Sequence, residues 1–557
     1  MKIEINRQFG RALDMAENSG RNIFITGRAG TGKSTLLTYF RDHTKKKIVI
    51  LAPTGVAALN VAGQTIHSFF GFGPDITLKK VKKLSSSNKR AGLYKKLETI
   101  IIDEISMVRA DLLDCIDRFM RLNGRELDLP FGGVQMIFIG DLYQLPPVVT
   151  GSDRLAFSIK YKTPFFFSSD VFQKLDIEYI ELDKIYRQKD QSFIDLLNAV
   201  RNNSITDEQI ELLNARHNPD YEISDRDYYV YLTPTNSAAE AINISLLNRV
   251  DRPEHRFYGE ITGEFDNKSM PTHLELSLKI GSQVMMLVND SCGEYVNGTI
   301  ARIIKIKKMS VYNEAADKEQ EERVIIVKTQ DGMISTVWPY TWKMYRYEFD
   351  RLTGMINSSE IGSFCQYPMK LAWALTIHKS QGKTFDKVIL DIDRGAFAHG
   401  QTYVALSRCT SFDGLLLKKR LLKKHIFVDW RVADFVTKFQ YKKSDTRISL
   451  EKKIELIEEA IKKNRTLEIT YLKTNDTKSC RVITPEKVGQ LTYLDKSFLG
   501  VEAYCHTRKE DRVFRVDRIL DIVPGKYRRS WDGKKWKEER GRFSASRPPR
   551  LIGEAGR

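Results

Sequence analysis

The sequence predicts an α/β protein whose N-terminal domain is built on a parallel sheet, and three observations predict it. A short apolar segment, "RNIFIT" at 21–26, is followed by a glycine-rich turn. A helix-like segment, "STLLTYFRDH" at 34–43, comes next. Two further apolar segments, around Ile100 and from Val134, end in Asp-Glu and in Gly-Asp. Buried strands that alternate with helices and end in polar residues are typical of a parallel sheet.

The glycine-rich turn, "GRAGTGKST", matches the phosphate-binding pattern G-x-x-x-x-G-K-[ST] completely. Glycines let backbone N–H groups surround phosphate oxygens, and the N-terminus of the following helix adds a favourable dipole. Lys33 can reach the β- and γ-phosphates and Ser34 can hold Mg²⁺. A turn without a ligand is the alternative, but it does not explain the flanking strand and helix. The predicted nucleotide-binding residues are Gly27, Gly30, Thr31, Gly32, Lys33, Ser34 and Thr35.

Two carboxylates, Asp103 and Glu104, follow the second apolar segment, "LETIIIDEISMV". Because parallel strands end at one edge of a sheet, both are expected beside the phosphate-binding loop. There Asp103 can complete a Mg²⁺ shell with Ser34, and Glu104 can polarise an attacking water. A kinase does not need the second acid, whereas a nucleoside triphosphate hydrolase does. Gln144 lies just past the third apolar segment, where it is predicted to sense the γ-phosphate or to orient water.

Two arginines far downstream are candidates for the same site. "LDKIYRQ" carries Arg187 and "TYVALSRCTSFDG" carries Arg408. Positive charge supplied from outside the phosphate-binding loop stabilises the charge that builds during phosphoryl transfer. If both arginines reach the γ-phosphate, the nucleotide must lie between two domains. Taken singly, each is explained equally well by a surface salt bridge.

The composition favours a polyanionic partner. The chain has 557 residues, and 89 Lys+Arg against 71 Asp+Glu give a net charge of +18. Such a surplus favours nucleic acid, although basic proteins without such a partner exist. The six cysteines show no C-x-x-C spacing, so free thiols are expected and a zinc site is not. The N-terminal segment has no apolar signal core and no apolar run approaches membrane-spanning length, so a cytoplasmic protein without a membrane partner is expected.

The order of these motifs resembles that of the Pif family of superfamily-one DNA helicases, in the RecD-like branch. The resemblance covers about residues 1–436, with "LAPTGVAALNVAGQTIHSFFG", "PFGGVQMIFIGDLYQLPPV", "MKLAWALTIHKSQGKTFDKV" and "GQTYVALSRCTSFDGL" in family order. It implies two RecA-like P-loop motor domains that use ATP and Mg²⁺. It also implies a nucleoid-associated, ATP-dependent helicase that moves 5′ to 3′ on single-stranded DNA. Forks, R-loops and G-quadruplexes are its implied substrates in replication, repair or recombination.

The resemblance also implies roles for single residues. Gln8 corresponds to the glutamine that reads the adenine edge, and Gly382 lies near the nucleotide where the second motor domain closes. Arg187 and Arg408 correspond to the family's two γ-phosphate arginines. The implied catalytic set is Lys33, Asp103, Glu104, Gln144, Arg187 and Arg408.

DNA contacts are implied in one set per motor domain, which stepping along a strand requires. From the residues alone, His67 and His378 would be packed structural histidines. The resemblance makes them DNA contacts, with Phe69 stacking on an unpaired base. It also implies single-stranded DNA and strand junctions as partners, and a monomer without DNA. The implied DNA-binding residues are Pro53, Thr54, Gly55, His67, Ser68 and Phe69, then Thr376, His378, Lys379 and Ser380.

The motor is expected to consist of three parts. The first motor domain spans 1–178, and its segment of about 74–97 is a wedge insertion. That segment carries eight Lys/Arg, which a wedge in phosphate contact and a solvated helix and loop explain equally well. The second motor domain spans 179–247 and 365–436. An SH3-like barrel at 248–364 lies between its halves.

A separate α+β domain is expected beyond the motor. A polar linker at 437–449 leads to 450–524, which resembles a WYL domain in "AYCHTRKEDRVFRVDRI" but lacks the Trp-Tyr-Leu of the name. Its arginines at 508, 512, 515 and 518 fit an anion groove or scattered surface charge equally well. The basic tail at 525–557 is expected to be flexible and to contact DNA. An ATPase switch with a regulatory C-terminal module is the alternative to a helicase.

Overall fold

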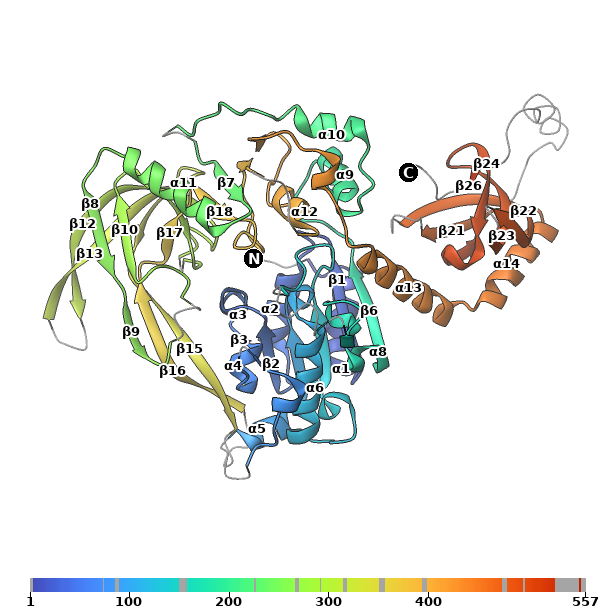
Figure 1. The fold of residues 1–557 in the computed structure, drawn as a ribbon, viewed down its shortest axis with the longest axis horizontal. Coiled ribbons are helices and arrows are strands. Elements are labelled where there is room, and N and C mark those ends of the chain that lie inside the picture. The colour runs from blue at the N-terminus through green and yellow to red at the C-terminus, as the bar shows by residue number, and fades with distance from the viewer. Residues whose placement is uncertain are drawn as a thin grey trace. The chain divides into compact units, whose positions relative to one another are not determined.

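The computed structural model describes residues 4–551 except 74, 86–89, 150–156, 158, 225–226, 266–269, 291, 314–317, 350–355, 393–397, 473–477, 494–495 and 526–549. The chain divides into two compact units (Figure 1). The first unit is Met1–Arg201 with Ile205–Phe427, and the second is Asn202–Ser204 with Val428–Arg557. Among the described residues, no helix combines the length and the apolar character that crossing a membrane requires.

A six-stranded, all-parallel sheet forms the centre of the first motor domain, in the order β3-β2-β4-β5-β1-β6. The three apolar segments predicted to be strands are β1, β4 and β5, which lie side by side. Their carboxyl ends therefore meet at one edge, and the predicted α/β class is confirmed. The strands are β1 (Asn22–Gly27), β2 (Ile48–Ala52), β3 (Gln64–Thr65), β4 (Thr99–Ile102), β5 (Gln135–Ile139) and β6 (Ile177–Leu182).

Helices pack against this sheet through apolar side chains. In the first helix, the Asn6 side chain caps the N-terminus by accepting from the N–H groups of Gln8 and Phe9, and Phe9 is buried in the core. The helices are α1 (Arg7–Asn18), α2 (Lys33–His43), α3 (Gly55–Asn60), α4 (Ile66–Phe70), α5 (Ala91–Lys96), α6 (Ala110–Asn123) and α8 (Asp170–Lys174). Short 3₁₀ turns are η1 (Leu78–Lys80), η2 (Ile105–Met107), η3 (Pro130–Gly133) and η4 (Phe166–Ser168).

The second motor domain has a four-stranded parallel sheet in the order β18-β7-β19-β20. Its core also contains Ala29 and Leu145 of the first domain, so the two motor domains share packed apolar contacts. The strands are β7 (Val230–Thr233), β18 (Ala374–Thr376), β19 (Val388–Leu390) and β20 (Leu415–Leu417). The helices are α9 (Gln191–Arg201), α10 (Asp207–Asn214), α11 (Asn236–Arg249), α12 (Gln401–Leu406) and η6 (Lys423–His425).

An antiparallel insertion separates α11 from β18. It consists of three sheets, in the orders β14-β13-β12-β11-β17, β10-β8 and β15-β16-β9. Its strands are β8 (Glu254–Tyr258), β9 (Glu260–Gly263), β10 (Glu275–Lys279), β11 (Gln283–Met286), β12 (Ile300–Asn313), β13 (Lys318–Thr329), β14 (Ile334–Val337), β15 (Tyr340–Phe349), β16 (Ile356–Gln366) and β17 (Met369–Leu371).

Two expected boundaries inside the motor are corrected by strand pairing. The boundary at 178 cuts β6, which pairs with β1 as far as Leu182. The boundary at 364 cuts β16, and β17 still pairs with β11 as far as Leu371. The insertion therefore ends at the residues just before β18.

The C-terminal unit is a helix pair with a sheet in the order β25-β21-β22-β23-β24-β26. The expected linker at 437–449 is wrong, because residues as far as 447 belong to a helix that starts at 430. The expected tail at 525–557 lies outside the described residues, apart from Gly525 and β26. The elements are α13 (Trp430–Arg447), α14 (Leu450–Lys462), β21 (Leu467–Leu472), β22 (Lys478–Tyr493), β23 (Lys496–Cys505), β24 (Glu510–Arg515), η7 (Val516–Arg518), β25 (Ile519–Pro524) and β26 (Arg550–Leu551).

Candidate nucleotide site and single-strand interface

The phosphate-binding loop joins β1 to α2 in a conformation that requires glycine. Gly30 and Gly32 have φ values of 79° and 84°, in the left-handed region. A Cβ at Gly30 would lie 2.5 Å from Cβ of Arg187, and one at Gly27 would lie 2.6 Å from Oγ1 of Thr31. The backbone is therefore packed into a narrow cradle in which the N-terminus of α2 is available to phosphate.

Lys33 lies inside this loop. Its Nζ donates to the carbonyl oxygens of Gly27 at 2.7 Å and of Arg28 at 3.0 Å. Burial of the amine lowers the pKa of Lys33, whereas the charges of Asp141 and Glu104 raise it. The lysine is thus held near the carboxylates at the end of the sheet.

Asp103 and Glu104 lie together at the end of β4. Burial raises the pKa of Asp103 to about 6. Burial, followed by the charge of Asp103, raises the pKa of Glu104 to about 7. Glu104 has a φ of 50°, which is unusual for a residue with a side chain and marks backbone strain at the end of β4. Asp103 and the Ser34 hydroxyl supply the oxygen ligands that Mg²⁺ prefers, so these residues fit that ion.

Gln144 is buried, and Gln381, which the sequence analysis missed, contacts it from the second motor domain. The Nε2 of Gln381 donates to Oε2 of Glu104 at 2.9 Å and to Oε1 of Gln144 at 3.4 Å. A single amide therefore touches both the predicted base and the predicted sensor. The signal available was the "HKSQG" segment, in which only the neighbours of Gln381 were singled out.

The two predicted arginines come close together on the second motor domain. Arg187 donates to the carbonyl of Ser407 at 3.1 Å. Arg408 is 1% exposed and donates to the carbonyls of Val404 and Lys383 at 2.9 and 3.2 Å. Burial, and then the charge of Arg187, lowers the pKa of Arg408 to about 9.

Neither arginine is a surface salt bridge. Within the described part of the chain, neither guanidinium forms an ion pair. Burial lowers the pKa of Arg187 to about 10. A buried and a half-buried cation beside the phosphate-binding loop make a site that favours an anion.

Further contacts tie the phosphate-binding loop to the second motor domain. The N–H of Ala29 donates to the Tyr403 hydroxyl at 3.0 Å, and Nε2 of His399 lies 2.9 Å from the carbonyl of Leu142. Gln188 donates to the carbonyls of Ser407 and Cys409 at 3.1 and 2.8 Å. None of these residues follows a local pattern that sequence reasoning could detect.

The residues expected near the base lie at the start of α1. The Nε2 of Gln8 donates to Oδ2 of Asp183 at 2.5 Å. Tyr186, which the sequence analysis did not single out, is 41% exposed and accepts from the Asn6 amide at 3.2 Å. Gly382 has a φ of 78° and open space where a Cβ would point.

The first set of expected DNA-binding residues contains exposed, half-buried and buried members. Thr54 is exposed and caps α3 by accepting from the N–H of Ala57 at 3.2 Å. His67 is half-buried, and burial, then Arg109, lowers its pKa. Pro53 and Gly55 are half-buried and Ser68 is exposed. Backbone and hydroxyl groups of this set are therefore accessible.

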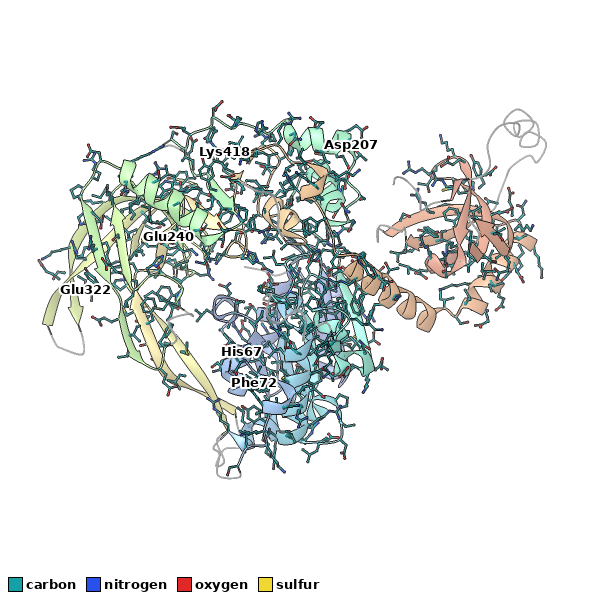
Figure 2. The ribbon with its side chains drawn as sticks, viewed as in Figure 1. His67, Phe72, Asp207, Glu240, Glu322 and Lys418 are labelled. Carbon is teal, nitrogen blue, oxygen red and sulfur yellow. The ribbon has the colours of Figure 1, made fainter. Side chains whose placement is uncertain are left out.

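The stacking role expected for Phe69 is wrong for this arrangement. Phe69 is 2% exposed, and its ring centroid lies 4.9 Å from that of Phe70 and 5.5 Å from that of Tyr94. Phe72 belongs to the same aromatic cluster, and Figure 2 shows it close to His67 at α4. The ring is covered by protein and cannot present a face to a base.

The second set is divided in the same way. Lys379 is exposed and His378 is half-buried, with a pKa that burial lowers. Thr376 and Ser380 are both buried. The Ser380 hydroxyl donates to the carbonyl of Ile377 at 2.7 Å, and the Thr376 hydroxyl accepts from the N–H of Lys379 at 3.2 Å. The side-chain contacts expected for these two hydroxyls are therefore wrong, because both complete the turn that presents Lys379.

A cavity of about 620 Å³ lies between α3, the insertion and the second motor domain. Lys370, Lys379 and Lys383 line it together with Asn60 and Trp342. Burial, then the charges of Lys379 and Lys383, lowers the pKa of Lys370 to about 7. Three converging amines favour a polyanion such as a phosphate backbone. The sequence analysis identified only Lys379 of the three.

Comparisons with known proteins agree with this geometry. The sequence matches the PIF1-like helicase family over residues 6–211 and the WYL domain over residues 452–524. It is 32% identical over 450 residues to the ATP-dependent DNA helicase Pif1 of Bdellovibrio bacteriovorus, which covers 79% of this chain and 93% of that protein.

Two solved structures are also similar. One is Pif1 from Bacteroides sp in complex with ADP-AlF4, with a TM-score of 0.70, 35% identity and coverage of 79% of this chain and 98% of that one. Another is Bacteroides Pif1 bound to single-stranded DNA, with a TM-score of 0.56, 36% identity and coverage of 79% and 98%. The Pif1 of Bdellovibrio bacteriovorus is matched along nearly its whole length. The chain therefore belongs to the PIF1-like helicase family, and its C-terminal unit carries a WYL domain.

Proposed function

We propose that this protein is an ATP-dependent DNA helicase that moves 5′ to 3′ on single-stranded DNA and unwinds duplex or structured DNA. One observation carries the proposal: groups from both motor domains converge on the phosphate-binding loop. Lys33, Glu104 and Gln144 come from the first domain, and Gln381 and Arg408 come from the second. A site shared in this way couples ATP hydrolysis to movement between the domains.

Each residue at the site has a chemical role in the proposal. Lys33 and the loop N–H groups hold the phosphates, and Ser34 and Asp103 would hold Mg²⁺, which neutralises phosphate charge when bound. Glu104 accepts a proton from the attacking water, which Gln144 orients. Arg187 and Arg408 stabilise the charge that builds on the phosphoryl group.

The base is expected to lie at the start of α1. Tyr186 offers an exposed ring face to adenine, and Gln8 offers its amide to the adenine edge. Tyr186 lies close to Gly32, since a Cβ there would be 3.9 Å from Tyr186, and Phe9, the neighbour of Gln8 in the chain, would be 3.1 Å from it. Gly382 leaves space on the opposite side of the cleft.

We place the single strand along the exposed groups of both contact sets and the cavity lysines. Thr54 and His67 would contact it on the first domain, Lys379 and Lys383 on the second, and Lys370 on the insertion. Because only one set is released at a time, opening and closing of the cleft moves the protein along the strand. Forks and strand junctions on nucleoid DNA are the proposed substrates, and a monomer is the proposed form before DNA binds.

Unwinding of a duplex that bears a 5′ single-stranded tail tests the proposal. The expected result is ATP-dependent strand separation that fails with a 3′ tail or without Mg²⁺. Hydrolysis stimulated by single strands but without strand separation would contradict it. That outcome would favour an ATPase switch, for which the presence of a WYL domain as a separate compact unit provides a candidate output. In the helicase, we propose that this domain adds a DNA contact.

A further inference from the structure

A buried ion pair next to Gln144 connects the two motor domains. Arg201, the last residue of α9, is 7% exposed, and its Nη2 donates to Oδ1 of Asp141 at 3.2 Å. The guanidinium carbon lies 3.9 Å from the centroid of the Tyr143 ring. Asp141 follows β5 of the first domain, whereas α9 packs in the core of the second. The pair therefore crosses the interface between the domains.

The same carboxylate also holds the sensor. Oδ2 of Asp141 accepts from Nε2 of Gln144 at 3.2 Å, and Oδ1 also accepts from the N–H of Tyr143 at 3.1 Å. Arg201 and Gln144 thus bind opposite oxygens of one fully buried carboxylate. A movement of the guanidinium turns the carboxylate and with it the oxygen that accepts the hydrogen bond of the Gln144 amide.

We infer that Arg201 is a positioning residue for ATP hydrolysis, which acts through Asp141 to orient Gln144 while the domains are together. This inference rests on the proposed function, because it assigns a partner to the sensor of that site. When the domains separate, the ion pair breaks and the Gln144 amide loses its fixed direction. Hydrolysis is thereby restricted to the closed arrangement.

The chemistry of arginine suits this position. A planar guanidinium can lie flat on the Tyr143 ring and still donate in its own plane to Asp141, which an ammonium group cannot do. Burial opposes the charge of Arg201, but Asp141 raises its pKa above the usual value, so the cation persists in the interior. Breaking such a pair leaves an uncompensated buried charge, which makes separation of the domains a two-state event.

The test is a double-mutant cycle on the full chain, with hydrolysis stimulated by oligothymidylate as the readout. Arg201→Met is expected to lower kcat about 100-fold through loss of orientation. Its KM for ATP should change by less than about threefold, because no nucleotide contact is lost. The double variant Gln144→Ala/Arg201→Met should hydrolyse ATP no more slowly than Gln144→Ala alone, because both changes disable one unit. Arg201→Lys should recover part of the loss.

Arg216 provides a matched control. Its Nε donates to the carbonyl of Leu415 at 2.8 Å inside the second domain. The effect of Arg216→Met should therefore multiply with that of Gln144→Ala. If the effects of Arg201→Met and Gln144→Ala on kcat also multiply, the inference is wrong. It is equally wrong if either single variant leaves kcat unchanged.

Thermal unfolding separates a loss of folding from a loss of positioning. Should Arg201→Met fail to fold, Arg201→Lys, which keeps the charge, enters the same cycle with the same criterion. The inference and the proposed function fail differently. A wild-type chain without strand-stimulated hydrolysis contradicts the function, whereas normal wild-type hydrolysis with multiplicative variants contradicts only the role of Arg201.

Discussion

Glu104 is a buried carboxyl whose neighbours oppose its ionisation. Burial and the charge of Asp103 raise its pKa from the usual 4.5 to about 7. A general base works only as the carboxylate, so activity should be present above this pKa and be lost as the pH falls through it. We expect kcat/KM for ATP, which reports the free enzyme, to fall about tenfold per unit below the pKa. A profile that stays flat down to the ordinary range of glutamate would contradict the assignment.

In the proposed function, Lys33 is the residue with the most direct phosphate role. In Lys33→Ala the cation that balances the β- and γ-oxygens is lost, and hydrolysis should fall at least about 100-fold. Binding of labelled single strands should be nearly unchanged, because the contact sets and the cavity lysines are intact. Fluorescence anisotropy and phosphate release measure the two effects. A variant that still hydrolyses ATP would contradict the loop assignment.

Arg408 should affect turnover without affecting nucleotide binding. Arg408→Ala removes positive charge needed only as phosphoryl transfer proceeds, so turnover should fall about 1,000-fold. Nucleotide affinity, measured by calorimetry, should change little. The Arg408 guanidinium also donates to the carbonyls of Val404 and Lys383, so its removal affects packing as well as charge. The melting temperature of the variant must therefore be measured together with its turnover. Normal turnover would remove Arg408 from the site.

Sequence alone could identify residues that stand at fixed offsets within a motif, and it missed residues that act from a distance. Lys33, Glu104 and Gln144 each follow an apolar strand, a signal that local patterning contains. Arg201 has no such signal, because its importance arises only when α9 folds against the first domain. Gln381 lies in the "HKSQG" segment, but its contacts with Glu104 and Gln144 form only when that turn meets the first domain. Burial, too, is invisible in a motif, which is why Phe69 was misassigned.

The short helix α4 has one face packed in the hydrophobic core and another face that is accessible. Phe69 and Phe70 face inward, where they pack against Tyr94 of the wedge region, whose hydroxyl donates to the carbonyl of Phe69 at 2.8 Å. His67 lies on the accessible side. The helix therefore joins the face on which we propose DNA contacts to the position of α5.

Variants of α4 should separate these two faces. Phe69→Ala is expected to destabilise the protein by about 3–5 kcal/mol, because it removes a buried ring. His67→Ala should leave the melting temperature nearly unchanged and weaken strand binding. Thermal unfolding and anisotropy together measure both. If Phe69→Ala weakened binding without loss of stability, the stacking interpretation would be restored.

At the level of elements, α13 was the largest error of sequence reasoning. Its second half lies in the segment "YKKSDTRIS", which is polar and has no apolar periodicity, and such a segment usually indicates a linker. The helix continues nevertheless as far as Arg447, because helix formation propagates from a first half that buries Val432 and Val436. The three central strands β1, β4 and β5 were easier to predict, since each is a buried run of apolar residues.

The division of the whole molecule predicts which part hydrolyses ATP. All the site residues lie in the unit that ends at Phe427. A chain shortened at 427 should therefore keep strand-stimulated hydrolysis within about threefold of the full chain, because no group of the site is removed. Cutting at 440 instead would divide α13, so it serves as the unfavourable control. Loss of hydrolysis at 427 would show that the second unit is needed for catalysis.

The interrupted second sheet has a consequence for how the protein is made. The first sheet is continuous in sequence from β1 to β6, so it can fold while the ribosome is still producing the rest. Strand β7 is different, because both of its neighbours, β18 and β19, follow the entire antiparallel insertion. During synthesis β7 must wait with unpaired edges until those partners emerge. The nascent chain is thus most exposed to misassembly and to chaperone capture in this interval.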